Sequence, residues 1–441
     1  MSLSRVETKK KAEQHKKTYT SNRKRLLWIN VALLAIIIIV VSAFTKGEYI
    51  VQTVKDGVST LFEQHENTES ETKAPDETET VSDENEDTNT LIDHPNVDLT
   101  SSPTPSTPSP TTNVEVKEEI PIEEPKVTLA FVGDILQGEY VNSLLKEHGY
   151  NYPYEKALFS LTSADYTMGN LELPMTRNGV PVDPQKKQYV FKGDPDGLSG
   201  LVYGGIDLVT LANNHTLDQG LEGLYDTMTH LDEHGIYHIG AGKNADEAYK
   251  PHLVEINGIK IAYLAASWVL PFHEWKATVY QGGLAETYDA TRILKEIETA
   301  KNEADIVVLY VHWGTERATT PEQRHIDMAK NYIDAGADLI IGSHAHVLQG
   351  FENYNGKWIA YNLGNFVFTA NPKKGQAETG VLHATCNKDA SCELSFVPMK
   401  TIVGQPTPLE DVEREALMEH LQSISLNGVK VNKDGTITVS P

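Results

Sequence analysis

The residues of this chain that could do chemistry occur in five short polar clusters, each of which follows an apolar run. The five segments are Leu129–Asp134, Met168–Glu172, Leu208–His215, Val307–His312 and Leu339–His346. Their polar side chains are Asp, Glu, Asn and His, the oxygen and imidazole ligands that proteins use for divalent metal ions. Five such clusters in one domain indicate a metal-dependent hydrolase, because a bound metal activates water for attack.

Strands must position these clusters. Continuous apolar runs of this length predict buried parallel strands, and ligands of α/β sheets bind beyond the carboxyl ends of such strands. We therefore expect one cleft to hold the following residues: Asp134, Glu172, Asn214, His312, His344 and His346. In an extended segment, the spacing of His344 and His346 would direct both rings to the same side. His215, beside Asn214, is a candidate general acid.

The order of these motifs resembles that of the CapA/PgsA family of capsule-synthesis proteins, within the calcineurin-like metallophosphoesterase superfamily. The motifs are GD at 133–134, GNLE at 169–172, ANNH at 212–215, HWG at 312–314, GSHAH at 342–346 and YNLGNFVF at 361–368. The similarity covers roughly Lys126 to Val403. It implies an α/β fold, a metallophosphoesterase-like layered β-sandwich flanked by helices. It also implies a role in making or exporting poly-γ-glutamate, with that anionic polymer and capsule synthase membrane components as partners.

Carried over by position, the resemblance implies a binuclear site for one or two divalent metals (Mn, Fe, Zn or Mg). Asp134 matches the first aspartate of the superfamily and Glu172 the bridging carboxylate. Asn214 matches an asparagine ligand, and His215 matches the proton-donating histidine. The remaining ligands match histidines: His312 and His344 for the second metal, and His346 for the first.

The chain departs from the superfamily pattern at two positions. Leu136 stands where a histidine is usual, and Glu172 stands where an aspartate is usual. One metal therefore lacks an imidazole, so that site is weaker, filled by another residue such as Asn170, or empty. Two functions stay open: a hydrolase of phosphoester or amide bonds, and a non-catalytic assembly or export factor of the synthase with a structural or vestigial metal site.

Other residues have two interpretations each. Asn170, Lys192 and Arg317, with Arg324, are candidates to meet an anionic substrate, while the charged ones among them could equally be solvated charges. The segment from Ser267 to Gly283, with Trp268, His273 and Trp275, is either a lid over the site or ordinary loop packing.

The charge pattern predicts a single-pass membrane protein. The 441-residue chain has a formal net charge of −24, which argues against nucleic acid as a partner. A basic N-terminus precedes an apolar run, Leu26–Phe44, long enough to span a hydrocarbon core of roughly 30 Å. The positive-inside rule then places the N-terminus in the cytoplasm and the main domain outside the cell membrane. A cleaved signal peptide is the alternative, with Val41–Ala43 as a cleavage site.

The chain divides by composition into five regions. They are a basic tail (1–25), a transmembrane helix (26–45), an acidic linker rich in Thr, Ser and Pro and expected to be disordered (46–125), the CapA-like domain (126–406) and a C-terminal extension (407–441). Within the domain, the pattern predicts helices over 154–161, 221–234, 290–302 and 321–335. For the extension it predicts one helix, 410–423, and one strand.

The two cysteines flank a turn-like stretch. Cys386 and Cys392 lie at facing ends of two strand-like segments, so the sequence predicts a hairpin. Outside the membrane such a pair could form a disulfide; two free thiols are the alternative.

Overall fold

The computed structural model describes residues 124–369 and 375–440, which belong to one unit of the chain, Ile120–Pro441. The expected transmembrane run Leu26–Phe44 and the expected linker lie outside the described residues. Among the helices of the described part, none is long and apolar enough to cross a membrane.

The larger sheet has ten strands and holds the first three polar clusters. Its strands are β1 (Lys126–Ile135), β2 (Tyr166–Leu171), β3 (Leu208–Thr210), β4 (Tyr237–Ile239), β13 (Asn365–Val367), β14 (Glu378–Asn387), β15 (Cys392–Ile402), β16 (Gln405–Pro408), β17 (Val429–Val431) and β18 (Thr436–Val439). The strand order is β17-β18-β15-β14-β1-β2-β3-β4, with β13 beside β1 and β16 beside β15. Strands β1 to β4 run parallel, and β14 joins β1 antiparallel.

The second sheet has six strands and holds the other two clusters. They are β6 (His252–Ile256), β7 (Ile259–Ser267), β9 (Ile306–His312), β10 (Leu339–Ser343), β11 (Leu348–Tyr354) and β12 (Lys357–Leu363). The order is β11-β12-β10-β9-β7-β6, parallel through β12, β10, β9 and β7, with an antiparallel strand at each edge. Two short strands, β5 (Ala241–Gly242) and β8 (Gly283–Leu284), form a separate ladder.

The central parallel strands, such as β1, β9 and β10, are buried on both faces because both sides of each sheet are covered there. In β1, Leu129 and Phe131 contribute to the core between the two sheets, whereas Ala130 and Val132 belong to a core that includes side chains of the outer helices. The Tyr310 hydroxyl donates to the Val132 carbonyl at 2.8 Å and ties the two sheets together. Successive residues of a strand face opposite sides, so a strand buried on both faces reads as one continuous apolar run.

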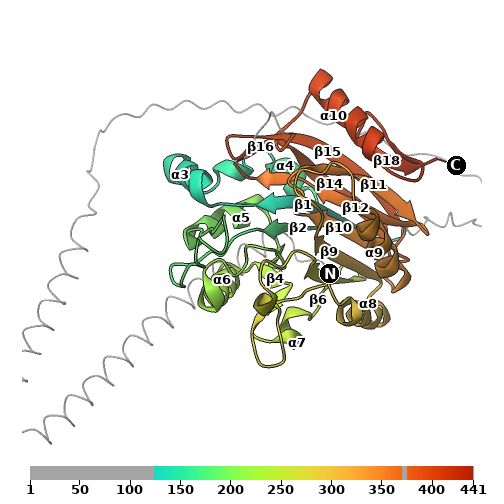
Figure 1. Ribbon diagram of the computed structural model, residues 1–441. Helices are drawn as coiled ribbons and strands as arrows, with labels where there is room; N and C mark the ends of the chain where they lie inside the picture. Colours follow the sequence, from blue (N-terminus) through green and yellow to red (C-terminus); the bar gives the residue numbers. More distant parts are fainter. Residues whose placement is uncertain (1–123, 370–374, 441) are drawn as a thin grey trace, which may run out of the picture. The chain divides into compact units, whose positions relative to one another are not determined.

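Helices cover the outer faces, so the domain is a mixed α/β sandwich of two sheets flanked by helices, as the sequence predicts (Figure 1). Helices on the side of the larger sheet include α3 (Glu139–His148), α5 (Leu198–Gly204) and α6 (Gly220–His234). Helices on the side of the six-stranded sheet include α8 (Thr291–Glu303) and α9 (Gln323–Asp334). The remaining helices are α4 (Leu158–Thr162), α7 (Ala245–Ala248), α10 (Asp411–Ile424) and the 3₁₀ turns η1 (Tyr152–Tyr154), η2 (Pro195–Gly197) and η3 (His273–Trp275).

Helices α6, α8 and α9 confirm three of the four helices predicted within the domain. The fourth prediction, a continuous helix over 154–161, is wrong: the chain forms η1, a turn and then the short α4. Tyr154 is fully buried and its hydroxyl accepts a hydrogen bond from Nε2 of Gln137 at 3.1 Å. Tertiary contact at Tyr154 therefore decides the local conformation against the helical pattern.

Two motif glycines are required because backbones approach closely there. A Cβ at Gly133 would lie 1.9 Å from the Gly364 carbonyl oxygen, and one at Gly342 would lie 1.9 Å from that of Tyr361. The amide of Asp134 donates to the same Gly364 oxygen at 2.9 Å. The segment that begins at Tyr361 thus contacts the strand ends of both sheets and helps to bring the clusters together.

The C-terminal extension is part of the same fold. Leu417 and Leu421 of α10 are buried in the core between the sheets, and β18 pairs with β15. The prediction of one strand in this region is wrong, because β17 and β18 form an antiparallel pair. Their residues Val429, Val431 and Ile437 are buried against the same core.

The predicted cysteine hairpin is present. Cys386 and Cys392 face each other across β14 and β15 and are joined by a disulfide, with Cα atoms 4.1 Å apart.

We expect the double substitution Cys386→Ala/Cys392→Ala to lower the free energy of unfolding by about 2 kcal/mol, the loop-closure value for so short a loop. Denaturant unfolding of the oxidised protein, the reduced protein and the double variant would measure this. Reduction should lower the free energy of unfolding of the wild type and leave that of the variant unchanged. Two reactive thiols in the oxidised wild type would contradict the disulfide.

Candidate metal centre

The six expected ligands come from both sheets and meet where parallel strands end. Asp134 is the penultimate residue of β1, Glu172 follows β2, and Asn214 lies in the loop after β3. From the other sheet, His312 ends β9, and His344 and His346 follow β10. All six are buried, with exposures between 0 and 9 %. The site therefore lies at the carboxyl edges of two packed sheets.

One asparagine holds both carboxylates. Nδ2 of Asn170 lies 2.8 Å from Oδ1 of Asp134 and 3.4 Å from Oε2 of Glu172. Oδ1 of Asn170 accepts from Nδ2 of Asn213 at 2.9 Å. Both ends of the Asn170 amide are engaged, so its contacts assign it to positioning the carboxylates rather than to meeting substrate or replacing a missing ligand.

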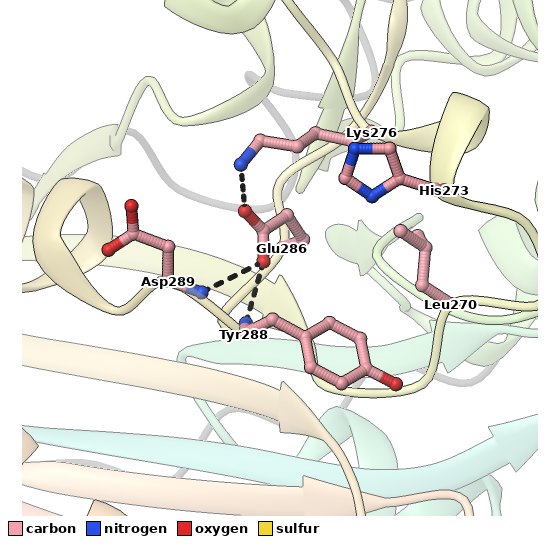
Figure 2. Close-up of a pocket in the computed structure, with 6 residues that line it drawn as sticks. All are labelled: Leu270, His273, Lys276, Glu286, Tyr288 and Asp289. Atoms are coloured by element: carbon pink, nitrogen blue, oxygen red, sulfur yellow. Dashed lines mark hydrogen bonds and ion pairs between the residues drawn. The ribbon is translucent and has the colours of Figure 1, made fainter.

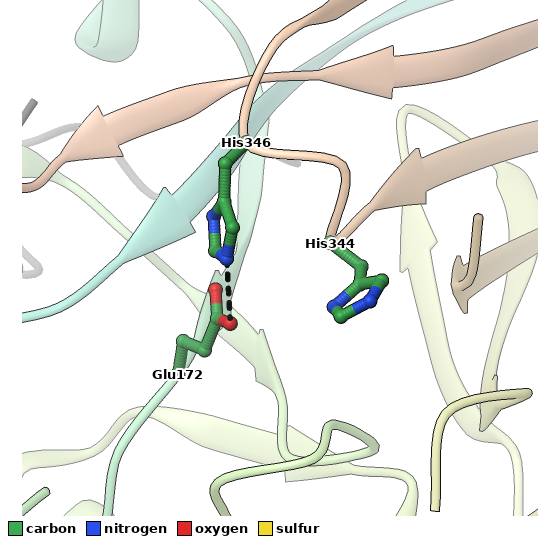
Figure 3. Close-up of side chains that lie close together, drawn as sticks. All are labelled: Glu172, His344 and His346. Carbon is green, nitrogen blue, oxygen red and sulfur yellow. Dashed lines mark ion pairs between the residues drawn. The ribbon is translucent and has the colours of Figure 1, made fainter. Parts of the chain in front are cut away.

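Glu172, His344 and His346 form the tightest part of the cluster (Figure 3). Their potential ligand atoms all lie within 4.8 Å of one another. Nε2 of His346 is 3.7 Å from Oε1 of Glu172, and Nε2 of His312 is 3.9 Å from the same oxygen. Oδ2 of Asp134 faces Nδ1 of His346 at 3.1 Å.

The expectation that His344 and His346 lie on an extended segment is wrong. Their φ angles are +94° and +57°, the left-handed region that non-glycine residues rarely adopt. The rings still come together, with centroids 5.8 Å apart, but the tight bend after β10 achieves this rather than the alternation of a strand. Such strain in a buried loop is typical of functional sites.

The chemistry of the site fits a divalent cation. Three buried atoms have no hydrogen-bond partner among the described residues: Oδ2 of Asp134, Oε1 of Glu172 and Nδ1 of His344. Leaving buried polar atoms unpaired costs free energy, roughly 1–3 kcal/mol each. A mixed set of carboxylate, imidazole and amide groups suits the first-row metals and magnesium. These atoms are therefore the ones that would hold a metal.

Further side chains orient the histidines. Nδ1 of His312 bonds Oγ of Ser343 at 2.9 Å, which leaves Nε2 facing Oδ1 of Asn214 at 2.8 Å, the two atoms with which these residues would bind a cation. Nδ1 of His346 donates to Oδ1 of Asn365 at 2.9 Å, which directs its Nε2 toward Glu172. Asn365 is the second asparagine of the YNLGNFVF motif, whose place in the site the sequence did not reveal. Such partners fix the tautomer and the direction of a metal-binding ring.

Burial and mutual charge shift the pKa values in this cluster strongly. Burial, reinforced by the charge of Asp134, raises the pKa of Glu172 well above its ordinary value. Burial lowers the pKa of His344 to about 3 and holds that of His312 well below its ordinary value. Burial opposes the charged form of His346, yet the negative charge of Asp134, whose Oδ2 lies 3.1 Å from Nδ1, raises the pKa of His346. Without a cation the site therefore favours the protonated forms of Glu172 and His346, and a bound cation would favour their deprotonated forms.

His215 belongs to a separate group beside the cluster. Its Nδ1 is 2.7 Å from Oδ2 of Asp218, and the ammonium of Lys187 lies 2.8 Å from the same nitrogen. Lys187 also forms an ion pair with Asp218. Nε2 of His215 has no hydrogen-bond partner among the residues that the structure describes, so it is available to a substrate. Burial lowers the pKa of His215, and Asp218 acts against that shift.

The other expected residues are not brought into the cluster. Leu136 is buried in the core behind the larger sheet, so no imidazole replaces the missing histidine there. Lys192 is exposed and donates to the Arg177 carbonyl, while Arg317 and Arg324 pair with Glu316 and Glu322 and keep more than half of their side chains exposed. The backbone of Arg317 nevertheless lies beside the two histidines, because its amide donates to the carbonyl of Ala345 at 2.7 Å.

The segment Ser267–Gly283 is tied to the domain. The amide of Trp268 donates to the His312 carbonyl at 2.9 Å, and Trp275 is buried. Glu286 pairs with Lys276 and accepts from the amides of Tyr288 and Asp289 (Figure 2). These residues, with Leu270 and His273, line a cavity of about 450 Å³. These contacts favour ordinary packing over a lid.

Sequence reasoning missed Asn213, Asp218, Ser343, Asn365 and Lys187. Three of them lie near a predicted site residue in the sequence. Asn213 and Ser343 directly precede Asn214 and His344, and Asp218 comes three residues after His215. A search for hydrogen-bond partners at such spacings could have found those three. Lys187 carries no signal, because it lies in an irregular segment 28 residues before His215.

The comparisons with known proteins agree on one family. The family model described as "Bacterial capsule synthesis protein PGA_cap" matches residues 128–370. A "Capsule biosynthesis protein CapA" of Bacillus anthracis is 30% identical over 292 residues, 65% of this chain and 70% of that protein. A "PGA biosynthesis protein CapA" of Bacillus subtilis (strain 168) is 30% identical over 319 residues, 71% of this chain and 82% of that protein.

Among solved structures, the chain is similar to the Haemophilus influenzae NAD nucleotidase, with a TM-score of 0.39 and 12% identity over 68% of this chain and 64% of that one. It is also similar to a Thermus thermophilus sulfate thiohydrolase, SoxB, with a TM-score of 0.38 and 13% identity over 67% of this chain and 60% of that one.

The pKa shifts predict how metal stabilises the fold. Glu172 and His346 have raised pKa values, so the stability they contribute without metal is present at low pH and is lost as the pH rises through those values. A cation holds Glu172 ionised, so the increase in melting temperature on adding Mn²⁺ should be larger near about pH 8 than near about pH 6. Calorimetry at both pH values, with and without Mn²⁺, would measure it.

Glu172→Gln separates the two contributions. It should leave the metal-free protein equally or more stable, because the Gln amide is neutral without binding a proton, and should remove most of the increase in melting temperature caused by Mn²⁺. The exposed control Glu255→Gln should behave as the wild type. An undiminished Mn²⁺ effect in Glu172→Gln would show that Glu172 is not a ligand.

Proposed function

The chain belongs to the bacterial capsule synthesis protein family PGA_cap, and we propose that it acts in poly-γ-glutamate capsule synthesis or export as a metal-dependent hydrolase. The bond cleaved is a phosphoester or an amide, as the resemblance to the calcineurin-like metallophosphoesterases implies. The observation that carries the proposal is the convergence of unpaired buried atoms from Asp134, Glu172 and His344 beside His215.

The chain's own residues divide the work of such a reaction. A bound divalent cation would supply an activated water and positive charge at the bond that breaks. Asp134, Glu172, Asn214, His312, His344 and His346 are the residues that would hold one or two such cations. In the hydrolysis, the oxygen of water adds to phosphorus or to the carbonyl carbon, and the bond to the leaving oxygen or nitrogen breaks. His215 gives its proton to that leaving atom from Nε2, while Asp218 orients the ring through Nδ1.

We further propose that the protein is anchored in the cell membrane by Leu26–Phe44, with residues 126–441 on the outer side. The basic residues before this run and the acidic sequence after it support that orientation. The partners would then be the membrane components of the capsule synthase and the anionic polymer itself.

A second candidate function is a non-catalytic assembly or export factor of the synthase. Leu136 favours it, because a buried aliphatic side chain occupies the position of the superfamily's histidine and leaves one metal with fewer ligands. The hydrogen-bonded pair of His215 and Asp218 favours the enzyme, because a structural metal site does not need an oriented acid beside it.

Two substitutions in the full-length protein should fail differently if it is an enzyme. His344→Ala removes a ligand, so both metal content and turnover should fall. His215→Ala removes the acid, so metal content should stay nearly normal while turnover falls roughly 10²–10⁴-fold. The measurement is metal stoichiometry beside hydrolysis of a phosphoester and of poly-γ-glutamate.

Equal loss of metal in both variants would make His215 a ligand and overturn its assigned role. If cells carrying either variant still form capsule, the site is dispensable there, and the assembly factor becomes the better description. His420→Ala, at a half-buried position of α10 outside the cluster, is a control that should change neither readout.

A further inference from the structure

Lys187 is a cation for which the proposed mechanism has no use so far. Its side chain is only 9% exposed, whereas the other ion-paired lysines and arginines of the described part keep 26% or more. It lies between His215 and Asp218, on the irregular segment that connects Glu172 to η2. Lys187 and Glu172 also affect each other's pKa, so the ammonium lies within electrostatic range of the metal cluster.

The fold does not need this ammonium to hold the segment in place. The amide of Val182 donates to the Asp218 carbonyl at 2.9 Å, and the amide of Phe191 donates to Oδ2 of Asp218 at 2.7 Å. Nε2 of Gln219 donates to the Phe191 carbonyl at 2.9 Å. These bonds fix the backbone on both sides of Lys187, so its side chain is directed to His215 by a loop that is already anchored.

The Lys187 ammonium also has more N–H donors than its neighbours accept. An ammonium carries three N–H groups, and Oδ1 of Asp218 takes one. When Nδ1 of His215 donates to Oδ2 of Asp218, as an imidazole acting as an acid requires, Nδ1 cannot accept from Lys187. Lys187 then keeps donors for an acceptor that enters the site. Its ring contact with Trp275, 5.5 Å to the centroid, makes no demand on those donors.

We propose that Lys187 is the substrate-binding cation of this site and receives an anionic group, phosphate or carboxylate, on the leaving-group side of the bond that breaks. The proposal rests on the proposed function, because it takes His215 as the residue beside the leaving atom. Such a cation is needed because an anionic substrate would otherwise be repelled by a chain of net charge −24 and by the two buried carboxylates. In a γ-glutamyl amide, the leaving nitrogen carries a carbon with an α-carboxylate, so the anion would lie next to the atom that His215 protonates.

Neighbouring lysines provide the test. Lys187→Met removes the charge, whereas Lys187→Arg keeps it. Lys187→Gln removes the charge but keeps an N–H donor for Asp218. Lys186→Met is the matched control, because Lys186 is exposed. The full-length protein is titrated calorimetrically with inorganic phosphate and with tri-γ-glutamate, with and without Mn²⁺. Circular dichroism and Mn²⁺ stoichiometry report the fold and the metal site independently of activity.

Loss of one charge-assisted hydrogen bond should weaken anion binding about 10- to 100-fold in Lys187→Met and Lys187→Gln. Lys187→Arg should bind more tightly than either of these, and Lys186→Met should match the wild type, with Mn²⁺ content unchanged throughout. Weakening confined to tri-γ-glutamate identifies a carboxylate, and weakening confined to phosphate identifies a phosphate group.

The inference is overturned if the folded Lys187 variants bind both anions as the wild type does, if Lys186→Met weakens binding equally, or if the wild type binds neither anion. These results leave the metal-dependent hydrolase standing when Mn²⁺ still binds. In the opposite outcome, the wild type binds no Mn²⁺, and Lys187→Met binds the anions more weakly than the wild type does. The proposed metal-dependent hydrolase would then be wrong, and the anion site would remain.

Discussion

The burial of two carboxylates side by side is the constraint on which the rest of this structure depends. Asp134 and Glu172 are both fully buried and share one amide donor, Asn170. Two ionised carboxyl groups cannot share a dry site without a compensating charge, so burial and the charge of Asp134 raise the pKa of Glu172, and Asp134 pairs with His346. A cation would remove the need for both compensations, and this is why we propose that the cluster binds metal.

The sandwich makes this burial feasible because neither sheet supplies the site alone. The larger sheet brings both carboxylates and Asn214, and the six-stranded sheet brings the three histidines. The chain passes from one sheet to the other between β12 and β13 through close backbone contacts: Gly342 of β10 lies against Tyr361 of β12, and Gly133 of β1 lies against Gly364. A side chain at either glycine would push the neighbouring segment away, so the spacing of opposite charges depends on backbone contacts that no ligand makes.

Family membership and chemistry are separate conclusions. Membership rests on the match across residues 128–370 and on relatives of 30% identity. The proposed chemistry rests on the arrangement of side chains: Leu136 offers no ligand, and His215, Asp218 and Lys187 form a hydrogen-bonded group that supplies our candidate acid. If the substrate is an anionic polymer, as we propose, positive charge is needed where it meets the site, and Lys187 is our candidate for that charge.

Sequence patterns predicted most of the strands and helices and the types of the candidate ligands. Continuous apolar runs predicted the buried parallel strands, and the polar residue after each run predicted which side chains would reach the edge, because the chain direction fixes where a strand ends. Tertiary structure alone decided the rest. The left-handed bend at His344 and His346 replaces the extended segment that their spacing suggested, since the turn must bring both rings back toward Glu172. Asn170, Asn365 and Lys187 acquire their parts only from partners far away in the chain, at 36, 19 and 31 residues. No local pattern encodes such pairings, because they depend on how two sheets and one irregular segment pack together.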